Sequence, residues 1–82
     1  MVWLYILQSR KTGRFYVGAT ERIDTREQEH NTGQTKSTRG RGPWMLVYSE
    51  EHPDRSSAMK RENQIKGWKS HRSIQALIDT ER

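Results

Sequence analysis

Residues 3–18 read WLYILQSRKTGRFYVG, and this stretch decides the fold. Trp3 to Leu7 form an apolar run rich in aromatic and branched side chains, and Phe15 to Val17 form a shorter one. Polar residues with one glycine separate them at positions 9–13. Aromatic and β-branched residues favour strands, and short polar segments with glycine favour turns. The sequence therefore predicts a β-hairpin.

The register of this hairpin decides where its two tyrosines lie. An even-numbered loop, such as residues 10–13, places Tyr5 opposite Gly18. The same register places Leu7 opposite Tyr16, so both tyrosine hydroxyls share one face of the sheet. The alternative is an ordinary hairpin with half-buried tyrosines whose hydroxyls meet water, because tyrosine is common in strands.

The composition predicts one small folded domain, residues 1–82. Hydrophobic and charged residues each make up 30% of the chain, and the mean hydropathy of -1.12 is close to that of disordered sequences. The apolar residues are nevertheless clustered at positions 3–7, 15–17, 44–48 and 74–78. That clustering favours a folded core with a polar exterior.

The net charge and the residue types that are absent reduce the range of possible functions. The formal net charge is +5, which suits a polyanion such as nucleic acid and equally suits simple solubility. The chain has no cysteine, which excludes disulfides and zinc-thiolate sites. Because we find no signal peptide and no membrane-spanning run, we expect a cytoplasmic protein without a membrane partner.

A helix with a charged stripe is predicted after the hairpin. Thr20 is a plausible N-cap for a helix over residues 21–30, which residues 31–33 then end. Ile23 is its only large apolar residue. The positions three, four and seven residues later share its face and are Arg26, Glu27 and His30. Such a helix docks stably only where these side chains meet polar groups.

The segment 33–43 is predicted to be a loop. It contains three glycines, one proline and no acid. Its three cations, Lys36, Arg39 and Arg41, suit contacts with phosphates, although a solvated connector has the same composition.

The remaining chain predicts one strand and two helices. Residues 44–48 form an apolar strand, and residues 50–55 form a turn. Ser56 or Ser57 caps a helix that runs to about Trp68, and Glu62 lies on its apolar stripe. Gly67 ends this helix, and Ser70 caps a last one whose apolar face is Ile74, Leu77 and Ile78. Glu62 is either a site residue or a solvated acid paired with Lys60, Arg61 or Lys66.

The predicted order is β-β-α-β-α-α, an α+β fold with a three-stranded, mainly antiparallel sheet flanked by helices. Within it, the quoted residues resemble the GIY-YIG nuclease superfamily, over about residues 3–68. The matching features are Tyr5, the triplet Tyr16-Val17-Gly18, Arg26, the run Glu29-His30-Asn31, and Glu62. The likeness is to small stand-alone bacterial members, which are similar to the catalytic domain of the UvrC excision nuclease. Only the tyrosine of the first triplet, Trp3-Leu4-Tyr5, matches the family pattern.

This resemblance implies a metal-dependent endonuclease that hydrolyses DNA phosphodiester bonds, as in DNA repair. It makes Tyr5 the general base, Arg26 the phosphate clamp and Glu62 the ligand of one divalent cation, Mg²⁺ or Mn²⁺. Nearby cations, with His30 among them, would lower the pKa of Tyr5 from roughly 10.

The remaining residues have supporting roles under this resemblance. His30 and Tyr16 assist Tyr5, and Gly18 is structural, through a close approach or a positive φ. Lys66 joins the loop cations in binding DNA, and branched and single-stranded DNA are both candidate substrates. The alternative is a non-catalytic nucleic-acid-binding module on the same fold. Glu62 argues against that alternative, because a carboxylate beside phosphate repels it.

Overall fold

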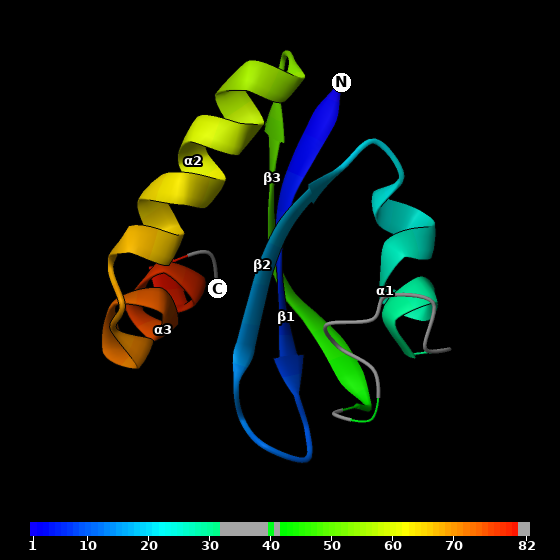
Figure 1. Cartoon of the computed structure of the whole chain (residues 1–82), viewed down its shortest axis with the longest axis vertical. Helices are drawn as coiled ribbons and strands as arrows, with labels where there is room; N and C mark the ends of the chain where they lie inside the picture. Colours follow the sequence, from blue (N-terminus) through cyan, green and yellow to red (C-terminus); the bar gives the residue numbers. More distant parts are fainter. Residues whose placement is uncertain (32–39, 41, 81–82) are drawn as a thin grey trace.

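The computed structural model of the chain describes residues 1–31, 40 and 42–80. Its sheet has three strands in the order β2-β1-β3, and both pairings are antiparallel (Figure 1). The strands are β1 (Val2–Ser9), β2 (Phe15–Thr20) and β3 (Trp44–His52). The helices are α1 (Ile23–Asn31), α2 (Arg55–Gly67) and α3 (His71–Thr80). The α+β prediction and its element order are confirmed.

The hairpin has the register that the even-numbered loop predicts. Tyr5 pairs with Gly18 and Leu7 with Tyr16. The backbone N–H of Ser9 donates to the carbonyl of Arg14 at 2.9 Å and closes the turn. Side chains two residues apart share a face of a strand, so both tyrosines lie on the same side of the sheet.

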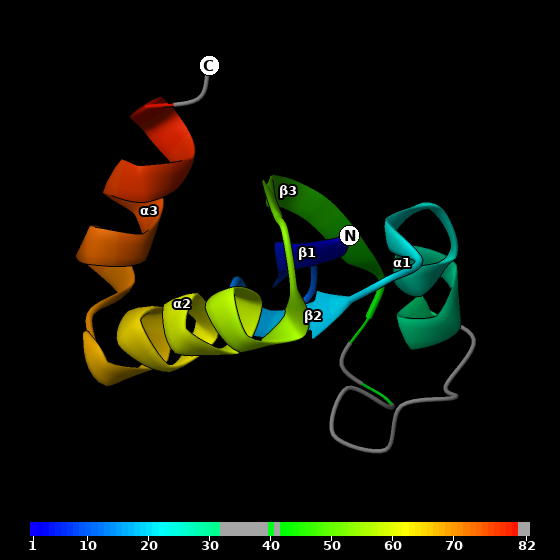
Figure 2. The same ribbon diagram turned by 90° about the horizontal axis from the view of Figure 1, so that it is seen from above.

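The central strand β1 is buried on both faces. Leu4 and Ile6 join the hydrophobic cluster that Ile65 of α2 and Ile78 of α3 complete. Tyr5 and Leu7 join a second cluster on the other face, beside Ile23 of α1. Figure 2 shows α2 and α3 on one side of the sheet and α1 on the other. Alternation along β1 therefore sends the tyrosine to the side that α1 covers.

Strand β3 continues into the predicted turn as far as His52, because it pairs with β1 from Trp44 to His52 with one register shift. The turn prediction for residues 50–52 is wrong. Glu50, a strand residue, accepts hydrogen bonds from the hydroxyl of Tyr48 and from Nε of Arg61 on α2. His52 Nε2 lies 2.6 Å from the second Glu50 carboxylate oxygen. A network of polar partners thus lets an acid continue the strand.

Two helix starts differ from the prediction. Helix α1 begins at Ile23, and the hydroxyl of Thr20 accepts from the backbone N–H of Arg22 before the helix begins. The N-cap of α2 is Asp54, whose carboxylate accepts from the backbone N–H of Ser57 at 2.8 Å. A carboxylate cap also favours the positive end of the helix dipole.

The end of the chain folds as its pattern predicts. Helix α2 ends at Gly67, and the hydroxyl of Ser70 accepts from the backbone N–H of Ser73. Ile74, Leu77 and Ile78 of α3 pack on the cluster around Leu4. None of the described helices is both long and apolar enough to cross a membrane.

Candidate active site

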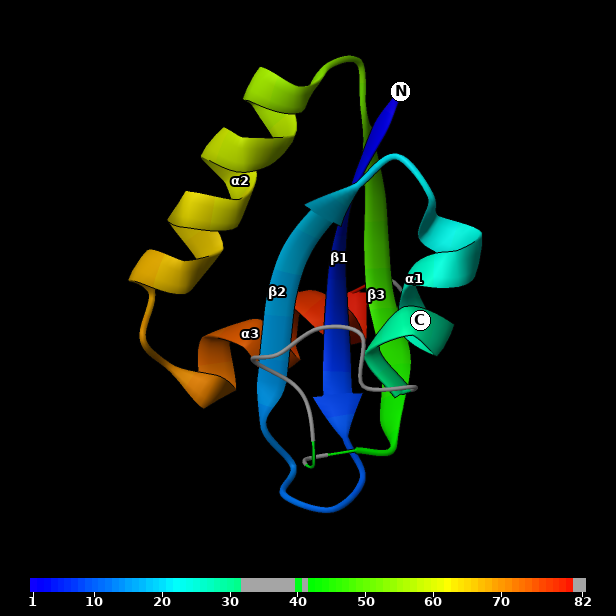
Figure 3. The same cartoon turned by 45° about the vertical axis from the view of Figure 1, so that its right-hand side comes forward.

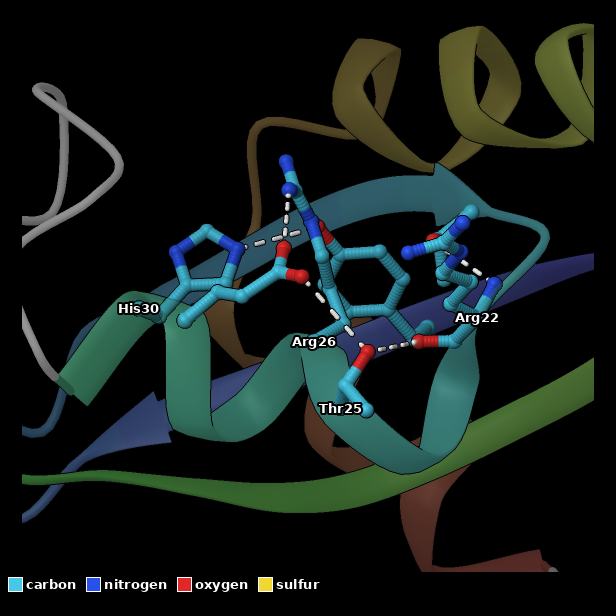
Figure 4. Close-up of polar contacts among 7 residues, drawn as sticks. Arg22, Thr25, Arg26 and His30 are labelled. Atoms are coloured by element: carbon cyan, nitrogen blue, oxygen red, sulfur yellow. Dashed lines mark hydrogen bonds and ion pairs between the residues drawn. The ribbon is translucent and has the colours of Figure 1, made fainter.

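The hydroxyl of Tyr5 is the centre of a polar cluster under α1. Tyr5 is only 1% exposed, and Nε of Arg26 donates to its Oη at 3.1 Å. Its Oη also lies 3.0 Å from Nε2 of His30, which is likewise 1% exposed. Figure 4 shows both side chains reaching from α1 toward the sheet. Arg26 and His30 of the charged stripe therefore face the sheet because they meet a buried phenol.

The second tyrosine completes the cluster from β2. The Tyr16 ring lies 4.7 Å from that of His30 and 6.3 Å from that of Tyr5, measured between centroids. It also meets Trp44 edge-on at 6.3 Å. Four of the predicted site residues, Tyr5, Tyr16, Arg26 and His30, are thus brought together on one face of the sheet.

Asn31 fixes the end of α1 that carries His30. Its side-chain amide donates to the carbonyl of Trp44 at 2.9 Å, and its amide oxygen accepts from the Trp44 backbone N–H. These two bonds imitate those of a neighbouring strand and hold α1 against the start of β3. Asn31 was predicted to lie in the segment that ends the helix, and its contacts with Trp44 were not predicted.

Gly18 is required by a close approach. A Cβ atom at this position would lie 2.6 Å from Oη and 2.7 Å from Cζ of Tyr5. Among the described glycines, positive φ is found at Gly13 and Gly40. Of the two structural roles predicted for Gly18, the structure therefore supports close packing under the phenol ring.

Gly18→Ala should displace Tyr5 and lower the stability of the fold. We expect the free energy of unfolding to fall by about 1–3 kcal/mol, because the buried ring has no free space to occupy. The matched control is Gly67→Ala at the end of α2, where an added Cβ meets nothing within 4 Å. Urea denaturation compares the two variants, and an equally stable Gly18→Ala protein would contradict the packing argument.

Burial dominates the electrostatics of the cluster. It raises the pKa of Tyr5, although Arg26 acts in the opposite direction. Burial and the Arg26 charge lower the pKa of His30 to about 4, so His30 is neutral at neutral pH. The contact with Tyr5 raises the pKa of Arg26 further, and this guanidinium stays charged. The prediction that His30 supplies a cation to Tyr5 is therefore wrong, because the buried imidazole sheds its proton.

Arg26 lines a hollow together with two arginines that were not predicted as site residues. This hollow, of about 320 Å³ at the end of β2, has Arg22, Arg26 and Arg55 in its lining. Glu29 also lines it and accepts from Nη1 of Arg26 at 2.8 Å. Arg22 lies four residues before Arg26 and Glu29 three after, so helical spacing could have found both. Arg55 comes from α2, and no local pattern connects it to this hollow.

Glu62 lies apart from the tyrosine cluster. Helix α2 packs against β2 and β1 and runs beside β2, one of the two edge strands (Figure 3). The Glu62 side chain pairs with Nζ of Lys66 at 2.6 Å, one of the partners predicted for it, but it is only 18% exposed and therefore not a solvated acid. Its carboxylate also raises the pKa of Tyr5, so its charge acts on the phenol. In the part of the chain that the structure describes, no hydrogen bond or ion pair joins the two residues.

The predicted DNA-binding cations have separate outcomes. Lys36, Arg39 and Arg41 lie outside the described residues. Lys66 lines a second hollow together with Arg14 and Lys69. Across residues 1–31, 40 and 42–80, no group of three His, Cys, Asp or Glu side chains is placed to hold a metal ion.

The hairpin that carries both tyrosines and the helix that brings Arg26 and His30 to Tyr5 lie within a range that matches a known catalytic domain. The model of the GIY-YIG catalytic domain matches residues 1–75, and the chain belongs to this family. Membership supports a nuclease-type function with a nucleic-acid substrate.

Relatives of this chain include UPF0213 proteins. One from Staphylococcus saprophyticus is 36% identical over 78 residues, which cover 94% of each chain. One from Photorhabdus laumondii is 42% identical over 65 residues, and the match spans 78% of this chain and 62% of the relative. The solution NMR structure of a UPF0213 protein from Bacillus halodurans superposes with a TM-score of 0.61 at 35% identity. That superposition covers 98% of this chain and 85% of the other.

Proposed function

We propose that the protein is a metal-dependent endonuclease that hydrolyses DNA phosphodiester bonds, with Tyr5 as general base. The observation that carries this proposal is the Tyr5 hydroxyl, held between a permanently charged Arg26 and a neutral His30. A phenol in this position has a donor to stabilise its oxygen and a neighbour able to take its proton.

The direction of the hydrogen bonds gives a proton path. Arg26 has no acceptor atom, so its Nε–H donates to the Tyr5 oxygen. The Tyr5 hydroxyl hydrogen can then be donated to Nε2 of His30, which accepts it in the neutral tautomer protonated at Nδ1. As Tyr5 takes a proton from the attacking water, its own proton passes to His30. The water oxygen bonds to phosphorus, and the bond from phosphorus to the leaving oxygen breaks, so that this oxygen departs with the bonding electrons and takes up a proton from solvent.

Arg26 and its neighbours suit the negative charge of the scissile phosphate. Nη1 of Arg26 is engaged by Glu29, and the side chain remains 31% exposed toward the hollow. Arg22 and Arg55 line the same hollow. Guanidinium groups bind phosphate oxygens in a planar, two-point geometry, and several together stabilise charge that grows in the transition state.

Glu62 fits a metal ligand by its donor chemistry. Mg²⁺ and Mn²⁺ prefer carboxylate oxygen and keep several waters, so one carboxylate with a substrate phosphate suffices. The side chain is largely buried, and its present partner is the exposed, exchangeable Lys66. The ion would neutralise negative charge on the phosphate and on the leaving oxygen.

His30 should make the fold acid-sensitive. Its folded pKa of about 4 lies below the ordinary value of 6.5, so the unfolded chain takes up a proton first as the pH falls. We therefore expect the free energy of unfolding to drop by about 1–3 kcal/mol between pH 6.5 and 4, much of it above pH 5. His30→Gln should flatten this slope in urea titrations, and His71→Gln, at an exposed position, should keep it. The same slope in all three proteins would contradict the burial of a neutral imidazole.

The test of the proposed function is cleavage of DNA by the purified protein. Supercoiled plasmid, single-stranded oligonucleotide and a branched junction are each incubated with Mg²⁺, Mn²⁺ or EDTA. We expect nicks or cuts with at least one metal, none in EDTA, and loss of activity in Glu62→Ala. Glu51→Ala, an exposed acid on β3, is the control and should remain active. Absence of cleavage on every substrate, together with metal-independent binding, would favour the non-catalytic module.

A further inference from the structure

A second hollow, of about 470 Å³, lies between the start of β2 and the junction of α2 with α3. Its cationic lining is Arg14, Lys66 and Lys69. Among its described lining residues there is no carboxylate, whereas two acids, Glu21 and Glu29, line the hollow beside Arg26. A cavity lined by cations without acids is suited to an anion rather than to a cation or an apolar ligand.

The same hollow carries a flat aromatic surface. The rings of Phe15 and His71 are stacked, with centroids 4.5 Å apart and planes 29° apart. Phe15 packs against the core around Leu4, and His71 is exposed. An exposed ring supported from below can stack on a nucleobase, and base stacking is how sequence-tolerant proteins hold single strands.

Lys69 stands at a position that a lysine rarely occupies. Its φ of 51° is in the left-handed region, where glycine is favoured and a side chain is strained. Its side chain nevertheless lines the hollow. A glycine would relieve the strain and remove the cation, so folding and ligand binding place opposite demands on this residue.

Lys66 connects the hollow with the proposed metal ligand. Lys66, a lining residue of the hollow, pairs through Nζ with Glu62 at 2.6 Å. A chain of phosphates bound in the hollow would therefore run next to Glu62.

We propose that this hollow binds a single strand of nucleic acid. Arg14, Lys66 and Lys69 contact its backbone phosphates, and the ring of His71 stacks on one of its bases. The inference rests on the proposed function in one respect, that the strand belongs to the substrate. Single strands suit the site because a paired base is not free to stack on a side chain.

The test measures binding without cleavage. Fluorescence anisotropy of a labelled single-stranded oligonucleotide is recorded in EDTA with wild type, Arg14→Gln and Lys69→Gly. We expect each variant to bind about three- to tenfold more weakly, with the slope of log affinity against log salt reduced by about 0.7 for each lost phosphate contact. Lys69→Gly should keep or raise the midpoint of thermal unfolding, so weaker binding cannot be attributed to unfolding. Arg72→Gln, an exposed cation of α3 outside this lining, is the matched control and should bind nearly as wild type.

Three other results would overturn the inference. Equal losses in Arg14→Gln, Lys69→Gly and Arg72→Gln would show a general charge effect. Competition by millimolar inorganic phosphate at constant ionic strength would show a site for free phosphate. Unchanged affinity in Arg14→Gln and Lys69→Gly would refute the strand site and leave the nuclease proposal standing. If these two variants bind more weakly but the wild-type protein cleaves no DNA, only the nuclease proposal is refuted.

Discussion

Tyr5→Phe is expected to slow DNA cleavage by about a hundred- to ten-thousand-fold, the usual contribution of a general base. The substitution removes only the Oη atom that contacts Arg26 and His30, and the buried ring remains. The protein should stay folded, because loss of one buried hydroxyl typically costs about 1 kcal/mol. Single-turnover cleavage of plasmid in saturating metal measures the effect on the chemical step.

Tyr48→Phe is the matched control for this substitution. Tyr48 is 7% exposed and donates to the carboxylate of Glu50 on the opposite face of the sheet. Both variants therefore delete a buried hydroxyl from a charged network, and only Tyr5→Phe touches the proposed site. Similar cleavage rates in the two variants would contradict the assignment of Tyr5.

Arg26→Lys is expected to lower the cleavage rate by about a hundred- to a thousand-fold even though the charge is kept. The guanidinium uses Nε for Tyr5 and Nη1 for Glu29, and its fork leaves further N–H groups for phosphate. A lysine has one nitrogen and cannot satisfy these partners together. The same single-turnover assay at constant pH measures the loss.

Arg61→Lys is the corresponding control. Arg61 donates from Nε to Glu50 and from Nη1 to Gln64. Its guanidinium therefore uses the same two nitrogens as that of Arg26, but at a place away from the tyrosines. We expect some loss of stability and nearly normal cleavage in this variant. If both lysine variants cleave normally, Arg26 is not a phosphate clamp.

The sequence was sufficient to predict the element order and the side of the sheet on which the tyrosines lie. The alternation of apolar residues along β1 and the length of the turn determine the pairing of Tyr5 with Gly18. The charged stripe of α1 was informative because Arg26 and His30 have no local reason to face inward. Local periodicity therefore predicts reliably which face a residue lies on when its neighbours in the sequence determine that face.

Features that depend on tertiary context could not be read from the sequence. The extension of β3 to His52 depends on pairing with β1, and Glu50 is tolerated there only because Tyr48, His52 and Arg61 surround it. The neutrality of His30 follows from burial, which its sequence neighbours do not reveal. Arg55 reaches the hollow beside Arg26 from a separate helix, and no spacing rule relates residues on different elements.

The most direct test of the central claim is a double-mutant comparison of cleavage rates for wild type, Tyr5→Phe, His30→Gln and the double variant on one plasmid substrate. If Tyr5 passes its proton to His30, the two residues act as one unit and the double variant should be no slower than Tyr5→Phe alone. If the fold-losses in cleavage rate of the two single variants multiply in the double variant, the proton path from Tyr5 to His30 is contradicted. A wild-type protein that leaves the plasmid intact would contradict the nuclease assignment itself.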